Sequence, residues 1–121
     1  MATETQSYDN LIGGEFPVVT ERVTIGSGAA LKRGTILGVV TSSGKYVAAD
    51  ATDTGSGATG TADPKAILLE DAAAASADVS NVLVALTGEF NSAKLIAKTG
   101  STVAGFKNAL RALSIFEKSV V

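Results

Sequence analysis

The most suggestive chemical pattern in the sequence is a run of glycines. Residues 55–60 read Gly-Ser-Gly-Ala-Thr-Gly and match the G-x-G-x-x-G pattern of dinucleotide-binding loops letter for letter. That mechanism requires a buried strand before the loop and a helix directly after it, so that the helix N-terminus meets the pyrophosphate. The flanking residues 51–54 and 61–64 have neither character. The pattern therefore predicts a surface loop or a mobile connector instead of a nucleotide site.

Several carboxylates lie in or near this loop. Asp50, Asp53 and Asp63 suggest calcium, but an EF-hand loop needs acidic ligands at alternating positions, a central Gly and a terminal Glu, and that pattern is absent. Glu70 and Asp71 suggest an acid–base pair. Adjacent residues on a strand point to opposite faces, however. We therefore favour the interpretation that the three aspartates solvate a loop. Glu70 and Asp71 are best interpreted as an exposed strand end.

The sequence contains no His and no Cys. Ser–His–Asp and Cys–His catalysis, His-ligated zinc and c-type haem are therefore excluded, and no disulfide can form. Lys45 lies in a Ser-Gly-Lys-Tyr turn of the kind that can present a prosthetic-group lysine at a hairpin tip. The apolar neighbours that usually mark such a lysine are missing, so a solvated lysine is favoured. We expect no catalytic residue, no cofactor and no metal site.

The composition is typical of a small β-rich protein. The chain has 121 residues, which is most simply one domain with a modest core. With four Phe, two Tyr and no Trp, that core must consist of Val, Ile, Leu and Ala, and thirteen Gly indicate frequent turns. A net charge of −2 indicates no basic face for nucleic acid. No apolar run is long enough to span a bilayer, and the first residues are too polar for a signal peptide. We therefore expect a soluble protein in the cytoplasm at synthesis.

The charges are segregated along the chain. Residues 50–89 are acidic, with Lys65 as their single base, whereas bases predominate from Lys94 onward. One-sided patches of this kind can guide a self-complementary assembly. A solvated surface is the commoner meaning of such runs.

The elements that position these residues are organised around residues 31–50. A β-branched strand over 35–41, a Ser-Ser-Gly turn and a short strand over 45–48 predict a hairpin. Residues 31–34 are expected to be a polar approach that turns at Gly34. Further strands are expected over residues 18–25, 66–69, 82–87 and 115–121. Residues 72–80 are expected to form a single helical turn or a loop, and residues 88–91 a turn.

One amphipathic helix is predicted near residues 102–113. Val103, Phe106, Leu110 and Leu113 form one apolar stripe at helical spacing, with Lys107, Asn108 and Arg111 facing away. Ser101 or Thr102 can cap the first turn, since a hydroxyl accepts from an otherwise unpaired backbone N–H.

The N-terminal segment divides into two parts. Residues 1–7 are polar and are expected to be a tail without structure of its own. Residues 8–17 carry four large apolar or aromatic side chains. They also contain Gly13, Gly14 and Pro17, which prevent a continuous strand ladder. This segment suits docking on another surface, and packing on its own domain is an equal alternative. We thus expect a flexible arm over residues 1–17 and one β-rich domain over residues 18–121.

Four segments resemble the head decoration proteins of lambda-like tailed bacteriophages. They are Leu-Lys-Arg-Gly-Thr-Ile-Leu-Gly at 31–38, Gly-Lys-Tyr at 44–46, Ala-Ile-Leu-Leu-Glu-Asp at 66–71 and Leu-Thr-Gly-Glu-Phe-Asn at 86–91. The resemblance covers roughly residues 8–116. It implies a mainly β (α+β) fold, a compact β-tulip-like domain of short, mostly antiparallel strands with the one short helix.

The resemblance also implies a function. Such proteins form homotrimers on the outside of the expanded phage head, at its three-fold and quasi-three-fold positions, and reinforce it against internal DNA pressure. Their N-terminal arm contacts the major capsid protein. Carried to this sequence, the capsid-contacting arm residues are Tyr8, Asp9, Asn10, Leu11, Ile12 and Phe16. The expected location is the outer surface of the virion, with no direct contact to nucleic acid or membrane.

Two other functions compete with this reading. A virion-surface β module that recognises a host glycan or receptor would need exposed aromatic side chains, because sugars stack on aromatic faces; Tyr8, Tyr46 and four Phe supply few. An enzyme would have to work with carboxylates and lysines alone. We therefore expect a structural protein that is not an enzyme.

Overall fold

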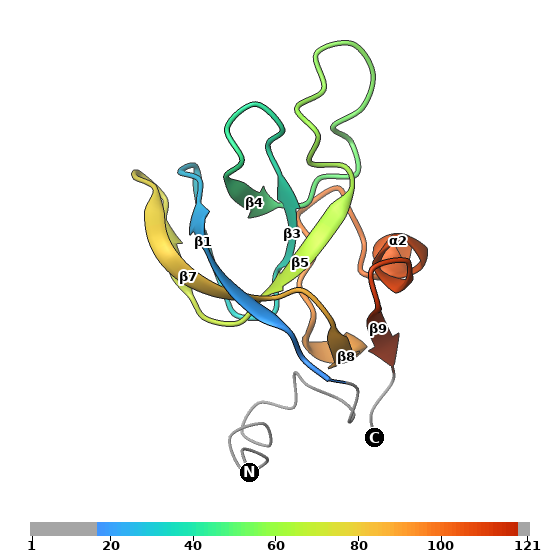
Figure 1. Cartoon of the computed structure of the whole chain (residues 1–121). Coiled ribbons are helices and arrows are strands. Elements are labelled where there is room, and N and C mark those ends of the chain that lie inside the picture. Colours follow the sequence, from blue (N-terminus) through green and yellow to red (C-terminus); the bar gives the residue numbers. More distant parts are fainter. Residues whose placement is uncertain (1–16, 119–121) are drawn as a thin grey trace.

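The computed structural model describes residues 17–118. Within that range five strands close into a barrel in the order β1-β4-β3-β5-β7 (Figure 1). They are β1 (Thr20–Ile25), β3 (Ile36–Val39), β4 (Tyr46–Ala48), β5 (Pro64–Leu68) and β7 (Val79–Ala85). All neighbours pair antiparallel except β1 and β4, which meet in parallel at Ile25 and Tyr46. The expected mainly β fold of short, mostly antiparallel strands is confirmed.

Two short ribbons flank the barrel. β2 (Ala29–Leu31) pairs antiparallel with β6 (Ala72–Ala74), and β8 (Gly88–Asn91) pairs in parallel with β9 (Ile115–Lys118). The helical segments are η1 (Ser92–Lys94), η2 (Ala104–Phe106) and α2 (Lys107–Arg111). No helix of residues 17–118 has the length and apolar character needed to cross a membrane.

The predicted hairpin is formed by β3 and β4, with Leu37 opposite Ala48 and Val39 opposite Tyr46. Gly44 in its turn has φ +73°, a conformation that glycine adopts without steric cost. Gly38 has a different role. A Cβ added there would lie 2.7 Å from the carbonyl oxygen of Thr61, so the absence of a side chain lets the following loop pack against β3.

The core consists of two clusters that share β3 and β5. Ile36 and Ile67 face the cluster under the helix, whereas their neighbours Leu37 and Leu68 face the cluster inside the barrel. Successive residues on a strand point to opposite faces, and all four are fully buried. Both faces of these strands are therefore covered, which explains their nearly continuous apolar sequence.

The predicted amphipathic helix is confirmed, although it is shorter than residues 102–113. Phe106 and Leu110 are buried in the cluster under the helix, and Val103 and Leu113 pack against its margin. Lys107, Asn108 and Arg111 are exposed, as expected. The Thr102 hydroxyl accepts a hydrogen bond from the backbone N–H of Gly105 at 2.9 Å, in the manner of a helix cap.

Two local predictions were wrong. Residues 72–74 form strand β6, not a helical turn or loop, because their alanines pair with Ala29, Ala30 and Leu31. Those partners form strand β2, which was not predicted as a strand; the predicted polar approach at residues 31–34 follows it and turns at Gly34, which has positive φ. Residues 88–91 form strand β8 instead of a turn, because β9 supplies a partner from a distant part of the chain.

Candidate functional site

The glycine-rich loop lies between β4 and β5, at one end of the molecule (Figure 1). Residues 54–59 are all exposed, and the chain continues from the loop into a strand, not a helix. A pyrophosphate would therefore find no helix N-terminus here. The predicted surface loop is confirmed.

Asp53 closes this loop on itself. Its carboxylate accepts hydrogen bonds from the hydroxyl and backbone N–H of Thr61, at 2.6 and 2.8 Å, and from the hydroxyl and N–H of Thr59, at 2.7 and 3.0 Å. These bonds, with the Thr61 hydroxyl first, hold the pKa of Asp53 far below its ordinary range. Among residues 17–118 no three acidic side chains gather in a way that could hold a metal ion. Asp53 therefore has a structural role, in which its carboxylate stabilises the conformation of the loop.

Glu70 and Asp71 serve separate partners. A Glu70 carboxylate oxygen accepts from the backbone N–H of Leu83 at 2.8 Å and lies 3.6 Å from the Arg22 guanidinium. Asp71 accepts from the backbone N–H of Arg33 at 2.8 Å. The two carboxylates hold different parts of the chain, so they do not form an acid–base pair.

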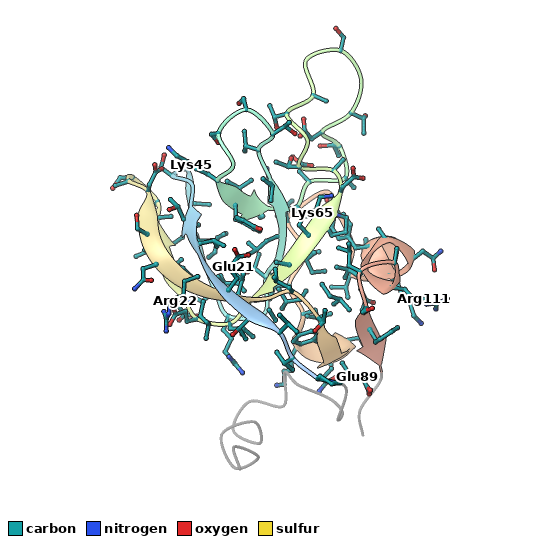
Figure 2. All side chains as sticks on the ribbon, viewed as in Figure 1. Glu21, Arg22, Lys45, Lys65, Glu89 and Arg111 are labelled. Atoms are coloured by element: carbon teal, nitrogen blue, oxygen red, sulfur yellow. The ribbon has the colours of Figure 1, made fainter. Side chains whose placement is uncertain are left out.

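Lys45 also has a structural partner. Its ammonium group lies 2.5 Å from one Asp78 carboxylate oxygen, and the other oxygen accepts from the backbone N–H of Ser27 at 2.8 Å. The hydrogen bond from Lys45 is the main cause that lowers the pKa of Asp78. Asp50 similarly binds Lys98 at 3.1 Å. Part of the acidic stretch is thus paired within the molecule. Figure 2 shows the labelled charged side chains on several different elements.

The predicted arm residues Tyr8, Asp9, Asn10, Leu11, Ile12 and Phe16 lie outside the described residues. The segment that follows them, residues 17–19, is fixed to the rest of the domain by hydrogen bonds. The Thr87 hydroxyl donates to the carbonyl oxygen of Pro17 at 2.9 Å and accepts from the backbone N–H of Val19 at 3.1 Å. The carbonyl oxygen of Val19 accepts in turn from the N–H of Leu86 at 2.7 Å. The sequence carries no motif that distinguishes Thr87 for this role.

This attachment point lies beside the ribbon of β8 and β9. Val18 packs on the core cluster that contains Phe90, and a Cβ added at Gly88 would lie 3.1 Å from both side chains. Figure 1 places the start of β1 and the end of β9 at the same end of the molecule. We call residues 17–19, 88–91 and 115–118 the terminal face. Val19, 52% exposed, gives this face an accessible apolar side chain.

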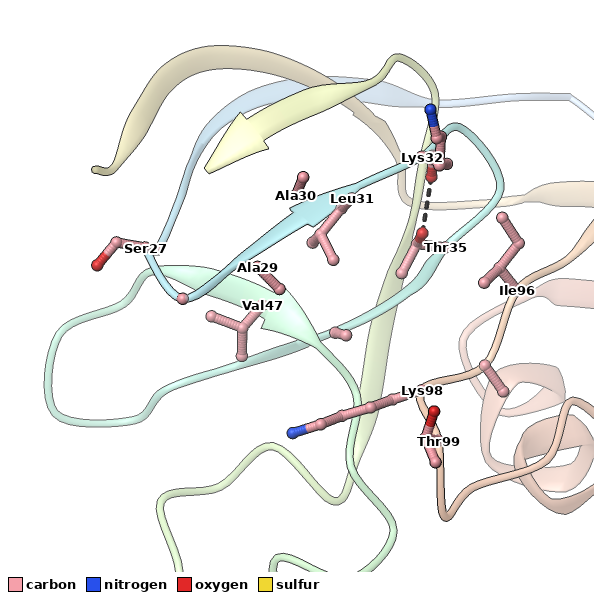
Figure 3. A pocket seen from close by; sticks show the side chains of 14 residues that line it. Ser27, Ala29, Ala30, Leu31, Lys32, Thr35, Val47, Ile96, Lys98 and Thr99 are labelled. Atoms are coloured by element: carbon pink, nitrogen blue, oxygen red, sulfur yellow. Dashed lines mark hydrogen bonds between the residues drawn. The ribbon is translucent and has the colours of Figure 1, made fainter. Parts of the chain in front are cut away.

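An open groove of about 460 Å³ lies elsewhere, between β2, β4 and residues 96–99 (Figure 3). Its lining is mainly small and apolar, with Lys32 and Lys98 as its charged residues. It contains no carboxylate to act as an acid or base and no aromatic ring on which a sugar can stack. The groove therefore offers no catalytic set and does not favour glycan binding.

Comparison with known families agrees with the sequence resemblance. The family model described as bacteriophage lambda head decoration protein D matches residues 2–117. No curated protein matches the chain. The family match spans nearly the whole sequence and includes the hairpin, both ribbons and the helix. The chain therefore belongs to the bacteriophage lambda head decoration protein D family.

Proposed function

We propose that the protein cements a phage head. As a homotrimer it binds the outside of the expanded capsid, at three-fold and quasi-three-fold positions, and stabilises the shell against the pressure of packaged DNA. The observation that carries this proposal is the family match over residues 2–117, since that family decorates phage heads. The role is structural and requires no catalytic residue, cofactor or metal.

The terminal face is the side that meets the capsid in this proposal. Residues 1–16 join the body there, next to Thr87, so an arm bound to the capsid pulls directly on the β7–β8 connection. An extended arm can add a strand to a sheet edge, with affinity from backbone hydrogen bonds and specificity from alternate side chains. The loop of residues 51–63 then points away from the shell (Figure 1).

Trimer formation strengthens such an attachment. One short arm binds weakly, because ordering its residues costs conformational entropy. Three arms held on one trimer act as linked binding modules, so the second and third bind at a high effective concentration. The same linkage clamps neighbouring capsid subunits together, which is what reinforcement requires.

Deletion of residues 1–16 tests the role of the arm. We expect the shortened protein to unfold in urea at nearly the same midpoint as the full chain, and to lose binding to expanded heads that lack the decoration protein. A matched pair refines the test: Leu11→Ser with Ile12→Ser should weaken binding strongly, whereas Glu4→Gln should not. Unchanged binding after the deletion would refute the arm as the capsid contact.

A further inference from the structure

The barrel closes through one short junction between β1 and β4, which we call the seam. The two strands share a single residue pair, Ile25 with Tyr46, whereas β1 shares five residue pairs with β7 on its other side. Directly after Ile25, the backbone N–H of Gly26 donates to the carbonyl oxygen of Tyr46 at 2.8 Å. Segments held by few backbone bonds open locally at a lower free energy than the rest of a fold. The seam is therefore the place where the barrel opens most easily.

The close approach of the two chain segments at the seam depends on Gly26. This residue is buried. A Cβ added there would lie 3.1 Å from a methyl group of Val47 and 3.4 Å from the Cβ of Lys45. Because Gly26 has no side chain, the chain that leaves β1 passes directly against the start of β4. Ser27 and Lys45 thus lie on the two sides of the seam.

The side chain of Asp78 joins these two sides. Asp78 directly precedes β7. One of its carboxylate oxygens lies 2.5 Å from the Lys45 ammonium group, and the other accepts from the backbone N–H of Ser27 at 2.8 Å. Figure 2 shows Lys45 beside the ends of β1 and β7, in agreement with these distances. One carboxylate therefore bridges the segment that follows β1 and the segment that precedes β4.

The bridge depends on the charge of Asp78. The hydrogen bond from Lys45, followed by the one from Ser27, lowers the pKa of this carboxyl, so the bridge persists from neutral pH down to the ordinary aspartate pKa of about 3.9. Among residues 17–118, Lys45 is the charged side chain that pairs with Asp78. Both side chains are partly exposed. An ion pair of this kind contributes little to the stability of a whole fold, so its effect is confined to the seam.

We propose that Asp78 is a latch that holds the barrel closed between β1 and β4, and that loss of its bonds to Lys45 and Ser27 opens the seam while the other strands stay paired. An open seam exposes the backbone edges of both strands, and exposed edges pair with other chains. The latch therefore protects the body of the protein against strand pairing with its neighbours. This inference concerns the free protein and does not depend on the proposed binding to phage heads.

Native-state hydrogen exchange of the full-length protein at neutral pH tests the latch. The Gly26 amide reports on the seam, and the Leu86 amide, which donates to Val19, reports on the pairing of β1 with the β7 side. Asp78→Ala removes both bonds of the latch. We expect the Gly26 amide to exchange about tenfold faster in this variant, as for the loss of a hydrogen bond to a charged group, and the Leu86 amide to exchange at the wild-type rate.

Two lysine variants separate the ion pair from a general effect of charge. Lys45→Met removes the ion pair and leaves the bond from Ser27 to Asp78, so the Gly26 amide should exchange faster than in wild type and more slowly than in D78A. Lys65→Met, at an exposed lysine of β5, makes the same change of net charge and is the matched control. Its Gly26 amide should exchange at the wild-type rate.

Salt gives a readout that needs no variant. At about 1 M salt the Debye length falls to about 3 Å, so the exchange of the Gly26 amide in wild type should approach the rate in K45M, whereas K45M itself should respond little. Wild-type protection of Gly26 in both D78A and K45M would overturn the inference. Loss of protection at Gly26 and Leu86 together would overturn it as well, because Asp78 would then stabilise the whole fold and not the seam.

Discussion

The hydroxyl of Thr87 accepts a hydrogen bond from the backbone N–H of Val19 at 3.1 Å, across a sequence separation of 68 residues. The same hydroxyl donates to the carbonyl oxygen of Pro17 at 2.9 Å. One side chain on the β7–β8 connection thereby fixes the direction in which the chain enters the body. In the proposed function it is the point through which a capsid-bound arm transmits force.

Thr87→Val should loosen this point and leave the barrel intact. The variant keeps the side-chain shape and removes both hydrogen bonds, each worth about 0.5–1.5 kcal/mol, and water can replace part of that at an exposed site. We expect a loss of about 1 kcal/mol in the free energy of unfolding, measured by urea denaturation, and weaker binding to heads. Thr54→Val in the exposed loop is the control. A Thr87 variant that binds heads as tightly as wild type would contradict the role of this anchor.

Asp53→Asn should open the base of the loop. The amide cannot replace the carboxylate as acceptor for four donors from Thr59 and Thr61. We expect the backbone amides of Thr59 and Thr61 to lose protection from hydrogen exchange at neutral pH, while strands β5 and β7 keep theirs. Asp63→Asn, near the end of the same loop, should leave both amides protected. Full protection in the Asp53 variant would show that packing alone holds the loop.

The same carboxylate predicts a pH dependence. The pKa of Asp53 is lower in the folded protein than in the unfolded chain, so its stabilising effect is fully present above the ordinary aspartate pKa of about 3.9 and is lost as the pH falls through the folded value. Protection of the Thr59 and Thr61 amides should therefore persist from neutral pH down to about pH 4. Loss of protection near pH 5 would contradict this assignment.

Phe106→Ala should remove a central part of the core under the helix. The ring is 3% exposed, and truncation of a buried Phe costs about 3–5 kcal/mol. We expect urea denaturation to show a loss of about 3 kcal/mol in the free energy of unfolding. Lys107→Ala truncates the exposed side chain of the next residue and should lower the free energy of unfolding by less than about 0.5 kcal/mol. A near-zero effect of Phe106→Ala would mean that the helix does not pack on this face.

Local sequence patterns were sufficient to predict the elements whose backbone hydrogen bonds are local. The hairpin of β3 and β4 follows from a β-branched run and a turn glycine that takes positive φ. The helix follows from the spacing of Phe106 and Leu110, which place one stripe on the core. In both cases the backbone hydrogen-bond partners lie close in the sequence, so the local pattern contains most of the information needed to predict the element.

Elements with distant partners could not be found in this way. Residues 72–74 are alanines, which favour helices in isolation, and they become a strand only because β2 lies beside them. Residues 88–91 contain turn-forming types and become a strand through parallel pairing with β9. The closure of the barrel through the pair of β1 and β7 likewise depends on contacts between distant segments. Thr87 is an ordinary residue by type, and only its hydrogen bonds to Pro17 and Val19 make it a candidate for function.

The central claim is tested most directly by co-sedimentation of the purified protein with phage heads that lack it, in the compact and the expanded form. The account predicts binding to expanded heads alone, saturating at one trimer for each three-fold and quasi-three-fold position. Failure to bind the expanded heads of its own phage, or equal binding to compact and expanded heads, would contradict it.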